Sequence, residues 1–267
     1  MQQPLISVVT VVYNAERIIE ETIKSILSQE YDNMEFIVVN GNSTDGTNAI
    51  IEKYHNRISC YINEPDHGIY DAMNKGIKAS TGDWLCFINA GDVFYSNTIL
   101  KDVFCRDFPP QVGLIYGDVE MTFKGEESFI KNNSALPPDT VQINLCHQAT
   151  FTKGDIIRKL SFDLRYKVAA DANLFTQVKE KGYSFKYVPV AIARYEAGEG
   201  FSHKQVWTIF KEYSAIQHLT WQKIAWWKYF FKTIIRVTAA KILPVKLYNE
   251  LYAKRIRSVN NKRIESV

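Results

Sequence analysis

The segment Glu35–Thr47, EFIVVNGNSTDGT, joins a short apolar run to a cluster of small polar residues. The segment Trp84–Asp92, WLCFINAGD, has the same form. Short apolar runs that end at such turn residues predict strands buried on both faces of a sheet. In an open parallel sheet, ligands bind just beyond the carboxyl ends of the strands. Oxygen-bearing side chains at two strand ends therefore predict a site for a sugar–phosphate ligand and a hard cation.

Strand-like and helix-like segments alternate on both sides of these two stretches. Predicted strands cover residues 5–12, 35–39, 58–62 and 84–88, and predicted helices cover 16–29, 47–54 and 68–79. This alternation predicts right-handed crossovers and a mainly parallel, Rossmann-like α/β sheet flanked by helices. Less regular elements follow, with strands expected at 113–121, 148–152 and 185–195 and helices at 170–181 and from 202 to about 243. The last of these predicts a helical appendage at the C-terminal end.

The composition limits the classes of protein that fit. The 267 residues are 46% hydrophobic, enough for one large core or for one domain with an appendage, and the net charge of +3 gives no reason to expect nucleic acid as a partner. The four cysteines lack metal-ligand spacing, which predicts free thiols and no zinc site. We expect neither a signal peptide nor a transmembrane helix, because the first strand follows almost at once and no stretch of about 18 apolar residues occurs.

Several polar residues follow the predicted strands. Asn40 and Asp45 are candidates to contact the base and ribose of a nucleotide, although Asp45 in a Ser-Thr-Asp-Gly-Thr turn is equally typical of a helix N-cap. Asp71 and Asn74 lie three residues apart on one face of the next helix, where Asp71 would also complement the helix dipole. His67 in the preceding loop is typical of an exposed loop histidine.

Asp92, Asp171 and the pair His147–Gln148 are the other candidates for chemistry. Asp92 is either a turn former or the ligand of a Mg²⁺ or Mn²⁺ ion on a diphosphate, which needs only one or two protein carboxylates. Asp171 begins a predicted helix and is either a helix N-terminal carboxylate or a general base. His147 and Gln148 either line the same pocket as Asp171 or have a structural role.

Five ordered segments resemble the inverting family 2 glycosyltransferases of the GT-A fold, and in particular the bacterial enzymes that build surface polysaccharides. The resemblance extends over about residues 4–202. The segments are SVVTVVYNAERIIEETIKSILSQ (7–29), EFIVVNGNSTDGT (35–47), NEPDHGIYDAMNKGIKASTGDWLCFINAGDVF (63–94), CHQATF (146–151) and FDLRYKVAADANLF (162–175).

The resemblance implies a nucleotide-sugar donor, most simply a UDP-sugar, a Mn²⁺ or Mg²⁺ cofactor and direct displacement with inversion. It implies Asp171 as the catalytic base, Asp92 as the metal ligand, and His147 and Gln148 on the acceptor side. The donor-binding positions that it implies are Val11, Tyr13, Asn40, Asp45, Asp66, Gly68, Asp71, Asn74, Asn89 and Ala90. It also implies a catalytic domain at 1–202, with a donor half at about 1–95 and an acceptor half at about 96–202, and a tail at 203–267.

Two positions depart from the family pattern. Asn40 stands where many members have Asp, and an amide both donates and accepts, so uracil stays compatible with it. Asn89-Ala-Gly-Asp92 offers one carboxylate where the family offers two or three.

From the resemblance we expect an enzyme that moves a sugar to a lipid-linked or polysaccharide acceptor. The alternative is a catalytically weak glycosyltransferase-like binding or assembly protein.

The C-terminal tail differs in composition from the rest of the chain. Between Lys204 and Lys246 it carries eight Lys or Arg residues, one acidic residue (Glu212) and four of the five tryptophans. Lys228, Lys232 and Arg236 recur every four residues among aromatic and aliphatic side chains, which is typical of an interfacial membrane helix. This predicts peripheral association with the inner face of the cytoplasmic membrane. Packing against the catalytic domain or a second subunit, as in a homo-oligomer, is the alternative.

Overall fold

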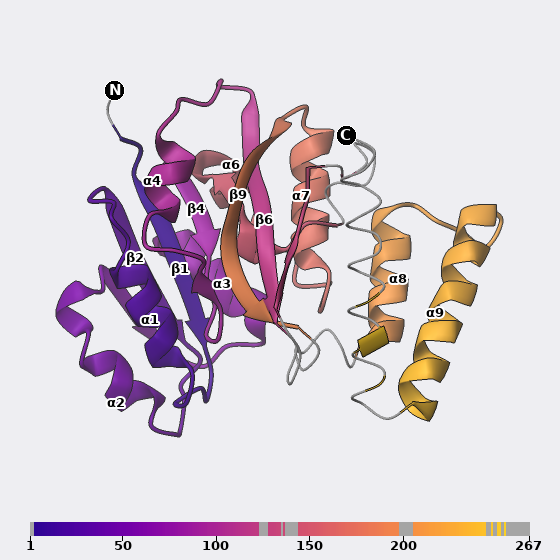
Figure 1. Cartoon of the computed structure of the whole chain (residues 1–267), viewed down its shortest axis with the longest axis horizontal. Coiled ribbons are helices and arrows are strands. Elements are labelled where there is room, and N and C mark those ends of the chain that lie inside the picture. Colours follow the sequence, from indigo (N-terminus) through magenta and orange to yellow (C-terminus); the bar gives the residue numbers. More distant parts are fainter. Residues whose placement is uncertain are drawn as a thin grey trace.

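The computed structural model describes residues 3–122, 128–134, 136, 144–197 and 205–243, together with positions 247, 250, 251 and 254. Its first half alternates strands and helices as predicted (Figure 1). The elements are β1 (Ile6–Val12), α1 (Ile19–Leu27), β2 (Met34–Asn40), α2 (Thr47–Glu52), the 3₁₀ turn η1 (His55–Arg57), β3 (Cys60–Asn63), α3 (Ile69–Ala79) and β4 (Trp84–Phe87). Helix α1 begins later than predicted, because residues 15–18 form a turn in which the Ala15 carbonyl accepts from Ile18 and Ile19.

The second half contains elements that the sequence pattern did not predict, namely β5, α4, β7 and α6. In chain order it has β5 (Val93–Phe94), α4 (Ile99–Phe104), β6 (Val112–Thr122), β7 (Phe129–Lys131), η2 (His147–Ala149), β8 (Thr150–Lys153), α6 (Gly154–Leu160), α7 (Ala170–Glu180) and β9 (Ser184–Glu196). His147 and Gln148 lie in the 3₁₀ turn η2 and not in a strand, so the predicted strand at 148–152 begins at Thr150.

One sheet runs through both halves, in the order β3-β2-β1-β4-β8-β6-β9-β5, with β7 paired to β6. The strands β3, β2, β1 and β4 are parallel, as predicted. From β8 onward the sheet is mixed, because β8 pairs antiparallel with both β4 and β6 whereas β9 runs parallel to β6. The carboxyl ends of the four parallel strands therefore lie along one edge, where the predicted candidates follow them.

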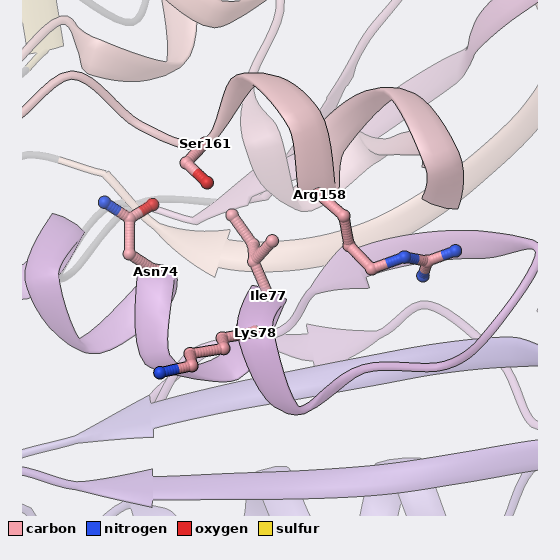
Figure 2. Close-up of a pocket in the computed structure, with 5 residues that line it drawn as sticks. All are labelled: Asn74, Ile77, Lys78, Arg158 and Ser161. Carbon is pink, nitrogen blue, oxygen red and sulfur yellow. The ribbon is translucent and has the colours of Figure 1, made fainter.

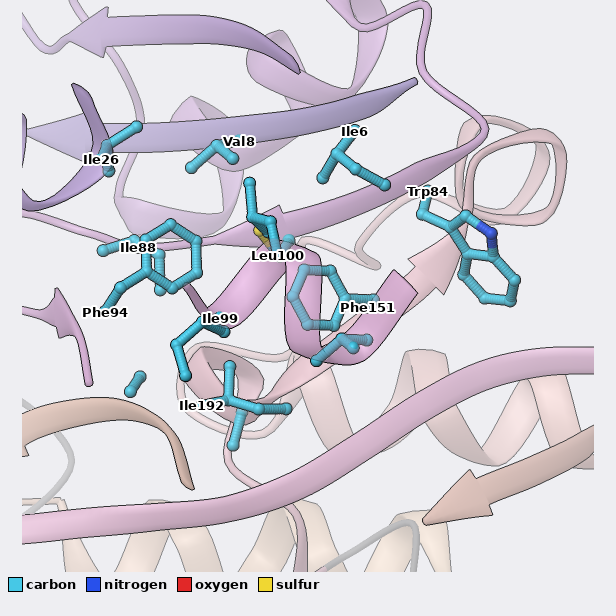
Figure 3. Packing of buried hydrophobic residues seen from close by; sticks show 14 of the residues in the cluster. Ile6, Val8, Ile26, Trp84, Ile88, Phe94, Ile99, Leu100, Phe151 and Ile192 are labelled. Atoms are coloured by element: carbon cyan, nitrogen blue, oxygen red, sulfur yellow. The ribbon is translucent and has the colours of Figure 1, made fainter. Parts of the chain in front are cut away.

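Both faces of the parallel sheet are buried, which explains the continuous apolar runs. Along β1, Ile6, Val8 and Val12 face one core, whereas Val9 and Val11 face the other. Helices α1 and α4 cover the first core, and Figure 3 shows Ile26, Ile99 and Leu100 packing there among the strand side chains. Helices α3, α6 and α7 cover the second core.

Gly76 sets the distance between α3 and β1. A Cβ atom at this position would lie 2.4 Å from Cγ1 of Val9, which is fully buried. We expect Gly76→Val to lower the free energy of unfolding by about 1–3 kcal/mol, because overpacking of a dense core forces side chains and backbone to shift. Urea unfolding would measure this, with Lys78→Ala on the exposed face of α3 as the control. An unchanged midpoint in Gly76→Val would contradict this account of the packing.

The predicted C-terminal helical region consists of two helices within the described residues, α8 (Val206–Ile216) and α9 (Ile224–Ile242). Figure 1 shows α8 between α7 and α9, in agreement with the contacts of α8 with both. The predicted helix start at 202 lies outside the described residues. Where the chain is described, no helix combines the length and apolar character that crossing a bilayer requires.

Candidate active site

Asp45 joins the loops that follow β1 and β2. Its Oδ2 accepts a hydrogen bond from the Glu16 N–H (3.1 Å) and its Oδ1 accepts one from the Thr47 N–H (3.0 Å). The Gly46 N–H in turn donates to Glu16 Oε2 (2.8 Å). These hydrogen bonds to Asp45, chiefly from Thr47, lower the pKa of its carboxyl group. Asp45 thus lies one residue before Gly46, the N-cap of α2, and is not itself the N-cap; it ties together the loops that border the site.

Asn40, at the end of β2, is fully buried. Its Oδ1 accepts from the backbone and hydroxyl of Ser43 (3.0 and 2.6 Å), and its Nδ2 donates to Asn48 Oδ1 (2.6 Å) and Tyr61 Oη (3.2 Å). The amide is therefore fully used within the protein. It shapes the 41–46 loop and presents no exposed atom to a ligand in this conformation.

Tyr13 and Asp66 meet at Gly41. Tyr13 is 63% exposed at the rim of the strand ends. A Cβ atom on Gly41 would lie 2.2 Å from Asp66 Oδ2 and 3.4 Å from the Tyr13 ring, so glycine is required for this approach. The other Asp66 oxygen accepts from the Gly68 N–H (2.9 Å), and Gly68 has a φ of +119° where α3 begins. These side chains offer an aromatic face and a carboxylate to a ligand.

Asp71 and Asn74, both on α3, bind the backbone of two different neighbouring segments. Asp71 Oδ2 accepts from the His67 N–H (2.9 Å), which fixes the loop after β3. The Asn74 amide pairs with the backbone of Phe162 through bonds of 2.7 and 2.9 Å. Figure 2 shows Asn74 beside a pocket that it lines with Ile77, Lys78, Arg158 and Ser161. This pocket lies between α3 and α6, so Asn74 is not brought together with the strand-end candidates.

The turn after β4 is held by α1. The Asp92 N–H donates to the Asn89 carbonyl (2.8 Å), and Gly91 takes a φ of +96°. Thr22, fully buried on α1, accepts from the Gly91 N–H (3.0 Å) and donates to the Asp92 carbonyl (2.9 Å). Thr22 is a positioning residue that sequence reasoning missed, because a threonine within a helical pattern carries no distinguishing signal.

A line of polar contacts joins this turn to Asp171. Asn89 Oδ1 accepts from the Val11 N–H (3.4 Å), so its Nδ2 donates to His147 Nε2 (3.1 Å). The neutral ring then carries its proton on Nδ1, which lies 3.6 Å from Asp171 Oδ2. Ala90 completes the attachment through its N–H, which donates to the Val11 carbonyl (3.2 Å). Val11 and Ala90 thus contribute backbone contacts that place Asn89.

Asp92 and Gln148 form the second link between these elements. His147 and Gln148 both lie near enough to the Asp92 carboxyl group to lower its pKa. Only part of Asp92 reaches the surface, and its carboxyl group lies among protein atoms; this burial raises its pKa to about 6, against the lowering effect of His147 and Gln148. The oxygen atoms of this carboxyl group have acceptor capacity left for a cation.

Asp171 sits in the first turn of α7 and is held on one side. Its Oδ1 accepts from the Ala172 N–H (2.8 Å) and from the Tyr70 hydroxyl (3.3 Å), whose one proton is shared with the Val168 carbonyl (2.9 Å). Burial, and then the charge of Asp171, raise the pKa of Tyr70 well above its usual value, so this hydroxyl stays protonated as a donor. Sequence reasoning missed Tyr70, which the apolar periodicity of α3 hides. Oδ2 of Asp171 faces His147 and is the oxygen with fewer donors.

The side-chain oxygens of the turn after β4 are suited to a cation that also binds phosphate oxygens of a ligand. Within the described ranges no group of three or more His, Cys, Asp or Glu residues could hold a metal ion alone. A Mg²⁺ or Mn²⁺ ion needs only one or two carboxylates when a diphosphate and water supply the other ligands. Asp92 fits that role, with Asn89 already engaged by His147.

Comparisons with known proteins indicate the family to which this sequence is similar. The family model "Glycosyl transferase family 2" matches residues 7–103, from β1 through the turn that holds Asp92 and into α4. A PGL/p-HBAD biosynthesis glycosyltransferase of Mycobacterium tuberculosis is 29% identical over 213 residues, which cover 76% of this chain and 81% of the relative. Residues 7–103 form a glycosyltransferase family 2 domain.

Solved structures agree with this assignment at the level of the fold. The glycosyltransferase superposes on Staphylococcus aureus TarS in complex with UDP-GlcNAc with a TM-score of 0.67 at 18% identity, over 79% of this chain and 65% of that one. It superposes on the mannosyltransferase PcManGT of Pyrobaculum calidifontis, in complex with GDP-Man and Mn²⁺, with a TM-score of 0.65 at 17% identity, over 99% of this chain and 85% of that one. The predicted GT-A fold is confirmed.

Proposed function

We propose that this glycosyltransferase moves a sugar, with inversion, from a nucleotide-diphosphate donor to a lipid-linked or polysaccharide acceptor in the synthesis of a cell-surface glycan. The observation that carries the proposal is the line of contacts Asn89–His147–Asp171, with Asp92 in the same turn as Asn89. It links a turn suited to a cation and a diphosphate with a carboxylate suited to accept a proton. Three segments far apart in the sequence, the turn after β4, η2 and the start of α7, converge to build it.

Asp171 is the proposed base. As an acceptor hydroxyl attacks the anomeric carbon, its proton moves to Asp171 Oδ2, a carbon–oxygen bond forms, and the bond from that carbon to the diphosphate breaks. His147 Nδ1–H faces the same oxygen at 3.6 Å and stabilises its charge before the transfer. Tyr70 and Ala172 fix the other oxygen, which holds the carboxylate in one orientation.

Asp92 is the proposed residue for a divalent cation, Mn²⁺ or Mg²⁺. When bound, such an ion neutralises charge on a diphosphate leaving group. The Mn²⁺ present in the PcManGT complex supports this assignment. Tyr13 and Asp66 are proposed to contact the nucleoside, whereas Asn40 and Asp45 shape the loop beneath it and Asn74 is left out of the donor site.

The donor is proposed to be a UDP-sugar, a proposal supported by the UDP-GlcNAc bound to TarS. Calorimetric titration with UDP, GDP and dTDP in the presence of Mn²⁺ tests this proposal without requiring an acceptor. We expect saturable binding of UDP and at least tenfold weaker binding of GDP. Preferential binding of GDP would transfer the proposal to a GDP-sugar, and no binding of any of the three would contradict a donor site at these strand ends.

The outer face of α9 is proposed to contact an anionic membrane surface. Phe210 of α8 packs against Trp226, Tyr229 and Phe230, with ring centroids 5.0 to 5.8 Å apart, so these residues form the inner face. The outer face, called here the α9 stripe, consists of Ile224, Trp227, Phe231, Ile235 and Ile242, each 43% to 75% exposed. Lys223, Lys228 and Lys232 are exposed beside it. Apolar and aromatic side chains with flanking lysines suit the boundary of anionic headgroups and acyl chains.

Replacing Trp227, Phe231 and Ile235 of the α9 stripe together by serine should weaken binding to vesicles that contain phosphatidylglycerol by at least about tenfold, because the variant loses apolar area that would insert. Sedimentation with vesicles measures the effect, and Tyr95→Ser, at an exposed side chain far from α9, is the matched control. Equal sedimentation of the triple variant and the parent protein would contradict the membrane contact. A triple variant that changes from a dimer to a monomer would instead identify the stripe as a subunit interface.

A further inference from the structure

Glu212, the one acidic residue between Lys204 and Lys246, reaches from α8 to the segment that leads into α7. Its Oε1 accepts a hydrogen bond from the Lys167 N–H (2.8 Å). Its Oε2 accepts from the N–H groups of Val168 (3.0 Å) and Ala169 (2.9 Å). A carboxylate that accepts three consecutive backbone N–H groups makes charge-assisted bonds, which are stronger than neutral ones.

The three amides that Glu212 binds stand directly before the helix that presents Asp171. Val168 is held at both ends of its backbone: its N–H donates to Glu212, and its carbonyl accepts from the Tyr70 hydroxyl, whose one proton is shared with Asp171. Ala169 is fully buried and precedes the first residue of α7. Glu212 and Tyr70 therefore fix the same peptide from opposite sides.

The packing of α8 supports the same connection. Ala169 and Ala172 of the Asp171 segment form a buried cluster with Ile216 of α8, and Tyr213 packs against that cluster. Burial, and then the charge of Asp171, raise the pKa of Tyr213 well above its usual value, which agrees with its position close to the proposed base. The residues of α8 that face the catalytic domain thus surround the start of α7.

We propose that Glu212 is a positioning residue for glycosyl transfer, which holds the 167–169 backbone so that the Asp171 carboxylate keeps its place beside His147. Helix α8 is then part of the active site and not only a connection to α9. This inference rests on the proposed function, because it requires that Asp171 act in the transfer. Glu212 itself contacts no substrate; it acts through the segment that carries the base.

Kinetic analysis of Glu212→Ala and Glu212→Gln tests the inference, with Lys211→Ala on the same helix as the control. We expect Glu212→Ala to lower kcat by roughly 100-fold, since small displacements of a catalytic group have effects of that size, and to leave the affinity for the nucleotide within about twofold. Glu212→Gln keeps one acceptor oxygen and should recover part of the lost kcat. In an Asp171→Asn background, Glu212→Ala should have no further effect, because the two residues act as one unit.

Hydrogen exchange of the full-length protein gives a readout that does not depend on turnover. Glu212→Ala should speed exchange of the amides of residues 167–169 and leave the strands of the nucleotide half protected. A kcat equal to that of the parent enzyme, or equal losses in the parent and Asp171→Asn backgrounds, would overturn the positioning role. If instead Asp171→Asn has full activity, the proposed function fails, whereas unchanged exchange at residues 167–169 in Glu212→Ala refutes the backbone attachment alone.

Discussion

Replacing Asp171 by asparagine is expected to lower the rate of sugar transfer by roughly 100-fold to 10,000-fold, the range that a general base contributes. An amide cannot take the proton of the acceptor hydroxyl. It also turns a donor group toward His147 Nδ1, because the Asn89 contact at Nε2 keeps the ring proton on the Nδ1 side. Steady-state kinetics with a saturating donor measures the loss in kcat.

The affinity for the nucleotide should stay within about twofold in this variant, since Asp171 lies on α7 and the strand-end loops do not depend on it. Asp163→Asn is the matched control, because Asp163 lies in the same sequence segment but pairs with Arg165. A kcat of Asp171→Asn within a few-fold of the parent enzyme would show that another group removes the proton.

Replacing Asp92 by alanine is expected to abolish the dependence of donor binding on Mn²⁺. Asp92 is the carboxylate at the end of β4, and the neighbouring Asn89 is engaged by His147 and Val11. Loss of a largely buried carboxylate that binds the cation costs about 2 kcal/mol or more of binding free energy. The Kd for the donor with Mn²⁺ should therefore rise by at least about 30-fold. Calorimetry with and without Mn²⁺ measures both quantities.

Binding of the nucleotide without metal should change little in Asp92→Ala, because the Tyr13, Gly41 and Asp66 surface does not involve this carboxylate. Asp32→Ala, at an exposed position, serves as the control. If Mn²⁺ strengthens donor binding equally in Asp92→Ala and in the parent enzyme, the cation is held elsewhere.

The nucleotide half of the fold was predictable because its strands are buried on both faces. Val8 and Val9 face opposite cores, so every position of β1 must be apolar or small, and the run stands out in the sequence. Fewer elements of the second half were predictable. Strand β5 has two residues and α4 has six, which is too short for a period to emerge. Strand β9 was predicted at 185–195, although it mixes exposed and buried positions along its length.

Some residues of the candidate site were likewise predictable from the sequence, and others were not. Asn89, Asp92, His147 and Asp171 follow strand ends or begin helices, positions where polar residues attract attention, and the structure brings them together. Asn40 and Asn74 were candidates for the same reason, yet their amides bind the 41–46 loop and the Phe162 backbone. The sequence alone could not reveal this, because it does not show which hydrogen bonds a side chain makes within the fold. Glu212 did leave a signal, as the single acid of a basic segment, but its three backbone partners are visible only in the fold.

The release of nucleoside diphosphate from a panel of UDP-, GDP- and dTDP-sugars is the measurement that tests the central claim most directly, namely that the His147–Asp171 site transfers a sugar. The full-length enzyme with Mn²⁺ and a membrane extract as the source of acceptor should release UDP from one donor, EDTA should stop the release, and Asp171→Asn should bind the donor without releasing UDP. Equal release by Asp171→Asn would contradict the claim. Saturable donor binding by the parent protein, with no release from any donor, would contradict it as well and would favour a binding or assembly protein.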